Sequence, residues 1–379
     1  MREPTYPFAR LVAEKADRAL TERLTATRGL GRQDAAPAPD VRALEAIIEA
    51  AFWASLRREE GYPPKISLAY VSPAHSDVRL MLERPLPLTS EELTRLAPAV
   101  ERPGIHLGVW HINGELSVWG ATRMLPASCF VLEVASPGVL VIKFSPGEET
   151  SKFLNFAVLE SDQVKMVNRD ATKQPGIPPL LLPLLGLGPP AVPAESADIP
   201  ARLAVSMRAH GRGGSLLVVP AHTQAWRQSV LEPIRYSVMP AFARLAELLQ
   251  DSPDEQHSQL WQERVQRAVD AIAGLTAVDG ATIINDRYEL LAFGASIRRR
   301  DGADQAERVL LTELIEDDSP RLVQGAQFWG NRHLSAVQFV HDQHDAVALV
   351  ASQDSRFTVF AWSPGQSVVQ AHRVDAFLL

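Results

Sequence analysis

A proline-crowded stretch between residues 175 and 200 most constrains how this 379-residue chain can fold. Proline fixes the backbone angle φ and removes a hydrogen-bond donor, so neither a regular helix nor an inner strand is expected there. The chain is also longer than one hydrophobic core usually holds. We therefore expect two domains, residues 1–195 and residues 200–379, connected within about 175–200. The prolines between those two ends are Pro178, Pro179, Pro183, Pro189, Pro190 and Pro193.

Composition and charge exclude several classes of protein. With 46% hydrophobic and 22% charged residues, the chain resembles folded globular proteins rather than disordered ones. Its formal net charge of −7 argues against a binder of nucleic acid polymers. The most apolar stretch, residues 180–187, is too short to span a membrane, and the N-terminal residues lack the apolar core of a signal peptide. We therefore expect a cytoplasmic protein without membrane contact, and the lone Cys129 excludes a cysteine-based zinc site.

The first half of the sequence predicts a small mixed α+β domain. Apolar residues recur every three or four positions over residues 42–58, which indicates an amphipathic helix. Asn113-Gly114 lies between two alternating apolar runs within residues 106–120, which is a strong signal for a β-hairpin. Further strands are expected at residues 66–70, 78–82, 130–134 and 139–144.

The second half predicts an α/β domain in which helices flank a central mixed sheet, because strand and helix patterns alternate along it. A short apolar run at residues 215–219 suits a buried strand and follows the glycine-rich residues 211–214. Helices are expected at residues 238–250, 260–275 and 334–340. The remaining strands are expected at residues 281–284, 289–293, 346–351 and 357–362.

Three polar segments of this half carry residue types that suit a nucleotide site. Asp279 precedes a strand, and its carboxylate can hold a divalent cation or accept a hydroxyl proton, while Gly280 permits close backbone approach. Gly330-Asn331-Arg332-His333 begins a helix, where anions are favoured and a guanidinium can bind phosphate. Ser352-Gln353-Asp354 follows a strand and offers a second carboxylate. Each segment alone is better explained by an ordinary turn or a capped helix start.

The order of these segments resembles the diadenylate cyclase domain family, which condenses two ATP molecules into the second messenger cyclic di-AMP. That family has a glycine-rich start to a buried strand, Asp-Gly-Ala opening a later strand, Gly-Thr-Arg-His-Arg at a helix start, and a strand ending in Ser-Glu-Glu. The matching segments here are Gly214–Val219, Asp279-Gly280-Ala281, Gly330–Ala336 and Asp345–Asp354. The resemblance runs from about Arg208 to Leu379.

The resemblance implies a mechanism and a set of site residues. Each protomer would bind one ATP, and two protomers would meet face to face. Mg²⁺ or Mn²⁺ would offset the negative charge of the phosphates. Asp279 would contact the metal or the attacking hydroxyl, Asp354 would be a second metal ligand, and Arg332 with His333 would hold the triphosphate. The remaining nucleotide contacts would come from Gly280, Ala281, Gly330, Asn331 and Ser352.

This sequence departs from the family at three positions, and the departures leave the function open. Asn331 replaces a threonine, Leu334 replaces a basic residue, and Gln353 replaces a glutamate. The domain is then either an active cyclase or a catalytically impaired nucleotide-binding sensor or regulator. A third hypothesis is an unrelated α/β protein whose turns match by chance.

The first half also resembles a known type of domain. Residues 54–61, with the sequence Ala-Ser-Leu-Arg-Arg-Glu-Glu-Gly, and the hairpin that carries Trp110 and Trp119 are similar to a sensor domain of the DACNV type, found ahead of such cyclase domains. The resemblance implies that this half regulates the cyclase. We expect both tryptophans to belong to the core rather than to a ligand site.

Overall fold

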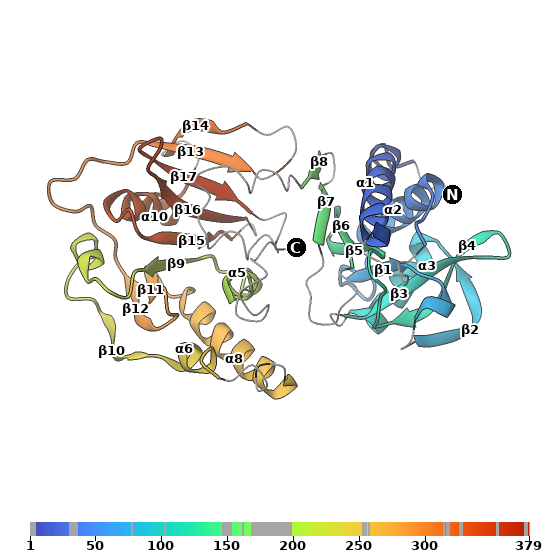
Figure 1. Ribbon diagram of the computed structural model, residues 1–379, viewed down its shortest axis with the longest axis horizontal. Coiled ribbons are helices and arrows are strands. Elements are labelled where there is room, and N and C mark those ends of the chain that lie inside the picture. Colours follow the sequence, from blue (N-terminus) through green and yellow to red (C-terminus); the bar gives the residue numbers. More distant parts are fainter. Residues whose placement is uncertain are drawn as a thin grey trace. The chain divides into compact units, whose positions relative to one another are not determined.

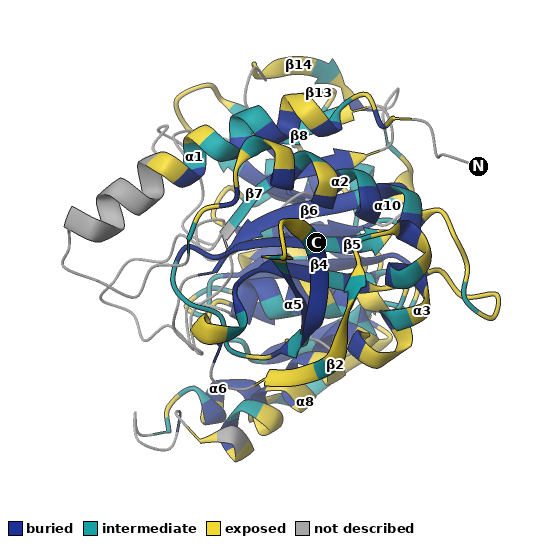
Figure 2. Ribbon diagram, turned by 90° about the vertical axis from the view of Figure 1, so that its right-hand side faces the viewer, coloured by how far each residue is buried: buried dark blue, intermediate teal, exposed yellow. Residues whose placement is uncertain are grey.

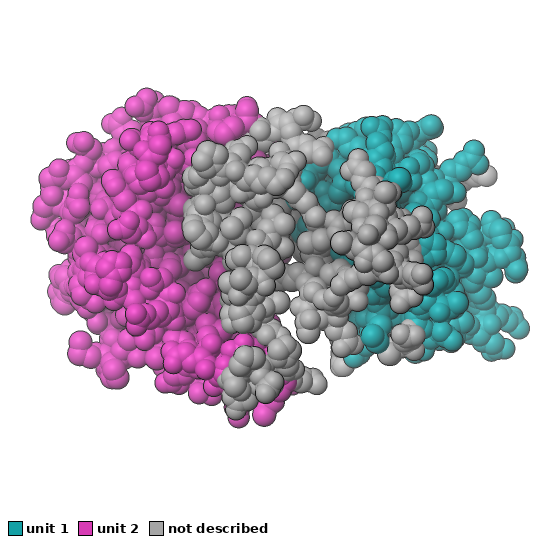
Figure 3. Space-filling model, viewed as in Figure 1, with its two compact units in different colours: residues 1–167, 379 teal, residues 168–378 magenta. Residues whose placement is uncertain are grey.

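The computed structural model forms two compact units, residues 1–167 and residues 168–378 (Figure 3). The described residues are 5–29, 37–76, 79–101, 104–145, 154–160, 163–167, 199–251, 256, 258–313, 315, 319–325, 329–353, 356–374 and 378. Most of the proline-rich stretch, residues 175–198, lies outside them. The position of the predicted domain connection therefore stays a prediction.

The first unit is built on a mixed eight-stranded sheet in the order β2-β4-β3-β1-β5-β6-β7-β8 (Figure 1). Its strands are β1 Ile66–Tyr70, β2 Arg79–Pro87, β3 His106–Ile112, β4 Glu115–Thr122, β5 Phe130–Ser136, β6 Val139–Phe144, β7 Leu154–Glu160 and β8 Gln163–Met166. Its helices are α1 Ala9–Gly29, α2 Val41–Ser55, the short 3₁₀ helix η1 Pro73–His75 and α3 Ser90–Val100. Strands β1 and β3 run parallel, and the other neighbouring strands of this sheet pair antiparallel.

Local sequence signals account for much of this unit. Asn113 and Gly114 join β3 to β4 with φ angles of 53° and 85°, the left-handed conformation that a two-residue hairpin turn of this sequence requires. Asp40 caps α2 by accepting a hydrogen bond from the Ala43 N–H at 2.7 Å. Trp119 is buried and its indole N–H donates to the Val71 carbonyl at 2.7 Å, which confirms its place in the core. Figure 2 shows buried residues along the inner strands, whereas the edge strand β2 is largely exposed.

The second unit confirms the α/β fold class with a mixed nine-stranded sheet in the order β10-β12-β11-β9-β15-β16-β17-β13-β14. Its strands are β9 Gly214–Val219, β10 Tyr236–Phe242, β11 Ala281–Asn285, β12 Leu290–Ala295, β13 Arg308–Glu313, β14 Arg321–Gln324, β15 Val347–Ala351, β16 Phe357–Ser363 and β17 Val368–Arg373. Its helices are α5 Ile199–Ala209, the 3₁₀ helix η3 Ala225–Ser229, α6 Arg244–Leu248, α8 Gln259–Leu275 and α10 Asn331–Asp342.

The predicted strand at residues 215–219 is the inner strand β9, between β11 and β15, and is buried on both faces. Leu216 and Val218 pack into the core on the side of α5, α6 and α8. Leu217 and Val219 pack into the core on the side of α10. Because side chains alternate along a strand, an unbroken apolar run is what a sheet covered by helices on both faces demands.

The predicted helix at residues 238–250 is wrong over its first part. Residues 236–242 form the edge strand β10, which pairs with β12, and only residues 244–248 form the short helix α6. Pro240 explains the difference, because proline in a helix interior removes a hydrogen bond and clashes with the preceding turn. An edge strand tolerates the missing N–H donor.

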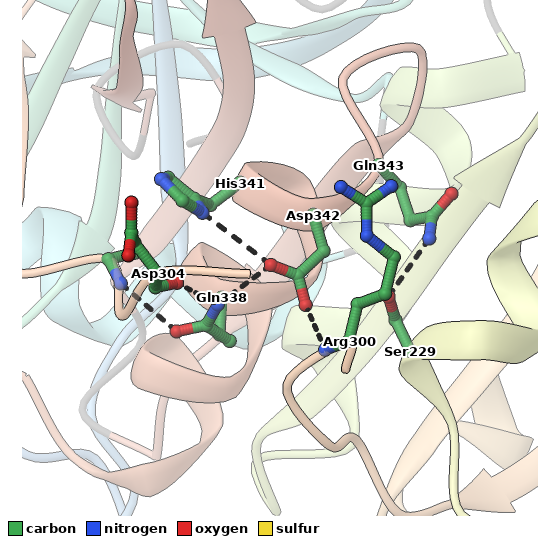
Figure 4. Close-up of polar contacts among 8 residues, drawn as sticks. Ser229, Arg300, Asp304, Gln338, His341, Asp342 and Gln343 are labelled. Carbon is green, nitrogen blue, oxygen red and sulfur yellow. Dashed lines mark hydrogen bonds and ion pairs between the residues drawn. The ribbon is translucent and has the colours of Figure 1, made fainter. Parts of the chain in front are cut away.

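Polar contacts hold the C-terminal half of α10 in place (Figure 4). The buried carboxylate of Asp342 accepts hydrogen bonds from the Arg300 backbone N–H at 2.6 Å and from the Gln338 side-chain amide at 2.8 Å. Gln343 donates to the Ser229 hydroxyl at 2.9 Å. The helix is thereby tied to the loop before β13 and to η3, which fixes where its N terminus lies.

We expect the stability of the second unit to depend on pH through His372. Burial in β17 lowers the pKa of its imidazole to about 4, and Nδ1 contacts the Thr312 hydroxyl at 2.7 Å. In the unfolded chain a histidine takes up its proton near pH 6.5, so below that pH the unfolded state binds more protons than the folded state. We expect a loss of about 2 kcal/mol in the free energy of unfolding between pH 7 and pH 5 from this residue.

Denaturant titrations at the two pH values test this expectation. His372→Gln keeps a side chain able to hydrogen-bond with Thr312 but does not titrate, so its unfolding free energy should fall about 2 kcal/mol less than that of the wild type. An identical pH dependence in the two proteins would contradict the assignment.

Candidate functional site

One edge of the nine-stranded sheet gathers segments from distant parts of the second unit. Strands β9 and β11 run parallel and begin there, while β15 and β17 end there and β16 begins there. The strand register pairs Ala351 with Gly214 and with Phe357, and it pairs Thr358 with Arg373. Helix α10 packs over β9, β15, β16 and β17. Polar residues that flank these strand ends are therefore brought together.

A cavity of about 600 Å³ lies at this edge. It brings together Asp279, Arg332 and His333, the three residues predicted to carry the chemistry. Its volume falls in the range of small-molecule sites. The described lining residues are Asp279, Trp329, Gly330, Asn331, Arg332, His333, Ala351, Ser352, Gln353, Arg356, Thr358 and Arg373.

Three predicted site residues are not part of this lining. Gly280 has a φ of +98°, and a Cβ there would lie 2.6 Å from the carbonyl carbon of Gly294, so β12 already requires a glycine. Ala281 is buried at the start of β11. Their predicted contact with a nucleotide stays a prediction. Asp354 lies outside the described residues.

The glycine-rich loop before β9 makes room for Arg332. The Arg332 guanidinium donates through Nη1 to the Arg212 carbonyl at 3.4 Å, and the Gln353 amide reaches the same oxygen at 3.5 Å. Gly213, at φ +69°, lies so close that a Cβ would be 2.9 Å from that Nη1 and 3.1 Å from the Ala351 carbonyl oxygen. A side chain at this position would therefore compete with the guanidinium for space.

We expect Gly213→Ala to weaken anion binding at the cavity as well as stability. The left-handed backbone costs about 1 kcal/mol for a residue with a Cβ, and the added methyl group also displaces the Arg332 guanidinium. Gly211→Ala is a matched control, because Gly211 has a φ of +65° and nothing within 4 Å of the added Cβ. Thermal unfolding should shift similarly in both variants, whereas calorimetric titration with ATP should show weaker binding only for Gly213→Ala.

His210 links the same loop to the segment that carries Asp279. Its Nδ1 accepts a hydrogen bond from the Arg212 backbone N–H at 3.1 Å, so Nε2 carries the proton toward the Thr276 hydroxyl at 3.2 Å. Desolvation, together with the charges of Arg212 and Arg332, lowers the pKa of His210, which agrees with a neutral ring. Thr276 caps the C terminus of α8 and donates to the Ala273 carbonyl at 2.6 Å. The turn with Asp279 follows directly.

An aromatic group forms the α10 side of the cavity. The ring of Trp329 lies parallel to that of His333, with centroids 6.2 Å apart, and meets Phe360 edge to face at 5.5 Å. The sequence interpretation missed Trp329, although this residue directly precedes the predicted Gly330 segment. It also missed Arg356, Thr358 and Arg373, whose place at the cavity follows from strand register rather than from any local pattern.

The charges around the cavity favour an anionic ligand. Among the described lining residues, Arg332, Arg356 and Arg373 carry positive charge and Asp279 carries negative charge. Arg373 also forms an ion pair with Glu313 at 2.9 Å. Gly330 is the N-cap of α10 and supplies no capping side chain, so the positive end of the helix faces the same space.

Comparison with known proteins finds a match to one domain family, within the first unit. Residues 33–123 match the family described as "Probable sensor domain DACNV". The matched span covers α2 to β4 of the first unit, and this sensor domain is found in diadenylate cyclase proteins. No catalytic cyclase family matched the chain, and no curated protein matched it. Among the described helices, none combines the length and apolar character needed to cross a membrane.

Proposed function

We propose that the second unit is a diadenylate cyclase, which converts two ATP molecules into cyclic di-AMP and two pyrophosphates, and that the first unit regulates it. The observation that carries this proposal is that Asp279 lines the same cavity as Arg332 and His333, although the chain separates them widely. The match of residues 33–123 to a sensor domain of cyclase proteins supports it independently.

The lining residues suit the reaction because phosphoryl-type transfer needs positioning and charge neutralisation more than covalent catalysis. Arg332 and the N terminus of α10 would hold phosphate oxygens, and His333 would donate a hydrogen bond to them. Asp279, which is exposed at the cavity mouth, would accept the proton of the attacking ribose 3′-hydroxyl or hold a metal.

A divalent cation fits this set of residues. Mg²⁺ is commonly held by one or two carboxylates together with substrate phosphates, and Asp279 is the carboxylate among the described lining residues. Mg²⁺ or Mn²⁺ at this position would neutralise charge on the phosphates.

The reaction as proposed needs a second copy of the chain. One cavity would hold one ATP, so the attacking hydroxyl must come from the ATP of a partner whose cavity faces it. Asp279, Gly330 and Asn331 are exposed, so the mouth can face a second protomer. A monomer would bind ATP without forming the product.

The departures from the family pattern at Leu334 and Gln353 have different consequences for activity. Leu334 is turned toward Gly325, where an added Cβ would lie 3.3 Å from its Cδ2, and it does not line the cavity. Arg356 and Arg373 line the cavity and supply positive charge there beside Arg332. Gln353 instead favours the second candidate, an impaired nucleotide-binding regulator, because its amide bonds with the Arg212 carbonyl where the family has a carboxylate.

Incubation of the full chain with ATP and Mn²⁺, followed by chromatography, separates the hypotheses. An active cyclase gives cyclic di-AMP with two pyrophosphates per product. An ATP-dependent thermal shift without product would indicate the nucleotide-binding regulator. Neither product nor thermal shift would indicate an unrelated α/β protein.

A further inference from the structure

Two arginines at the cavity belong to none of the segments that first pointed to a nucleotide site. Arg356 lies between β15 and β16, and its carbonyl accepts a hydrogen bond from the Ser352 N–H at 2.9 Å. Arg373 is the last residue of β17. Both line the cavity, on the side of the sheet edge away from Asp279.

The fold holds Arg373 in a defined place. Its guanidinium Nη1 is 2.9 Å from Oε1 of Glu313, the residue opposite it on the parallel strand β13, and the two side chains are 20% and 14% exposed. Ala371, two residues earlier, packs into the core beneath α10. Because side chains alternate along a strand, Arg373 also lies on the α10 face, where the cavity is.

Strand order sets the sequence of charged groups along the sheet edge. Asp279 precedes β11, Arg332 and His333 begin the helix that crosses the middle strands, and Arg373 ends β17. Four strand spacings separate β11 from β17, which amounts to roughly 19 Å. Along the sheet edge, Asp279 and Arg373 therefore lie toward opposite ends of the cavity, with Arg332 and His333 between them.

We propose that Arg356 and Arg373 form the subsite for the terminal phosphates of the bound nucleotide. This inference rests on the proposed function, in which the ribose 3′-oxygen bonds to the α-phosphorus, its proton passes to Asp279 and from there to solvent, and the α–β phosphoanhydride bond breaks. Pyrophosphate then leaves with the electron pair of that bond. Two guanidiniums at the far end of the cavity bind the departing group where its negative charge grows.

The test is calorimetric titration of the full chain with ATP, AMP and inorganic tripolyphosphate. Arg356→Gln and Arg373→Gln should each weaken the binding of ATP and tripolyphosphate about tenfold or more, while AMP binding changes less than about twofold. Arg308→Gln is the matched control. Arg308 is exposed at the end of β13 opposite to Glu313, and the substitution removes the same positive charge. It should change no affinity.

Further comparisons between variants and between ligands separate a failure of the subsite from a failure of the proposed function. Arg356 is exposed, so Arg356→Gln tests the subsite without disturbing the core, and Arg373→Lys should recover part of the affinity if charge is what matters. Equal losses for AMP and ATP, or no loss in either glutamine variant, would overturn the subsite. Wild-type binding of tripolyphosphate but not ATP would refute the nucleotide function and leave the subsite standing. Binding of neither would refute both.

Discussion

Asp279→Asn should reduce the rate of cyclic di-AMP formation by about 10² to 10⁴-fold while leaving the fold intact. An amide neither accepts the proton of a ribose hydroxyl nor holds a divalent cation as a carboxylate does. The side chain is exposed at the cavity mouth, so its replacement removes no core packing. The measurement is the rate of product formation at fixed protein concentration with ATP and Mn²⁺, resolved by chromatography.

Asp345→Asn is the control for this experiment. Asp345 is exposed just before β15, at the opposite end of that strand from the cavity, and the substitution changes the net charge equally. It should retain wild-type turnover. Thermal unfolding of both variants should match the wild type, which separates a chemical defect from a folding defect. Unchanged turnover in Asp279→Asn would remove this carboxylate from the mechanism.

Asp342→Ala should lower the free energy of unfolding of the second unit by about 3 kcal/mol. The substitution leaves the Arg300 backbone N–H without the acceptor that it now uses. It also removes one of the two acceptors of the Gln338 side-chain amide, which keeps the Asp304 carbonyl at 3.1 Å. Each hydrogen bond lost inside the protein costs roughly 1–3 kcal/mol. The carboxylate is buried, so water does not simply replace it. Denaturant unfolding measures the loss, and hydrogen exchange of the α10 amides should show that the helix opens more readily.

Two related variants calibrate this effect. Asp342→Asn keeps one acceptor oxygen, so it should lose less stability than the alanine variant. Asp345→Ala removes an exposed carboxylate three residues further on and should change stability by less than about 0.5 kcal/mol. Because α10 also carries Arg332 and His333, Asp342→Ala should weaken ATP binding as well. Wild-type stability in Asp342→Ala would show that this network does not fix the helix.

The elements that could be predicted are those with a strong local signal. The hairpin turn at Asn113-Gly114 and the buried strand around residues 215–219 follow from residues adjacent in the chain. Strand β17 has no such signal, because its polar Gln370 and His372 are buried among apolar residues. Helix α10 was expected from its periodic apolar residues, but it begins earlier, at Asn331, and ends later, at Asp342.

The residues of the candidate site also divide into those with a local sequence signal and those without one. Asp279, the Gly330–His333 segment and Ser352 could be selected because polar residues at strand ends and helix starts stand out locally. That they share one cavity depends on strand order, which no local pattern gives. Arg356 and Arg373 could not be selected, because an arginine beside a strand is usually solvated surface. The place of Arg373 becomes visible only when β17 is known to lie between β16 and β13, and that of Arg356 only when β16 is known to pair with β15.

That position of β17 orders the assembly of the domain during synthesis. Strands β13 and β14, residues 308–324, are made before β17, residues 368–373, yet β13 reaches the rest of the sheet only through it. The β13–β14 hairpin therefore cannot join the sheet until the ribosome has added the intervening segment and β17. A nascent chain released before residue 368 would lack both Arg373 and the docking partner of Glu313, and its hairpin edge would stay open to association with other chains.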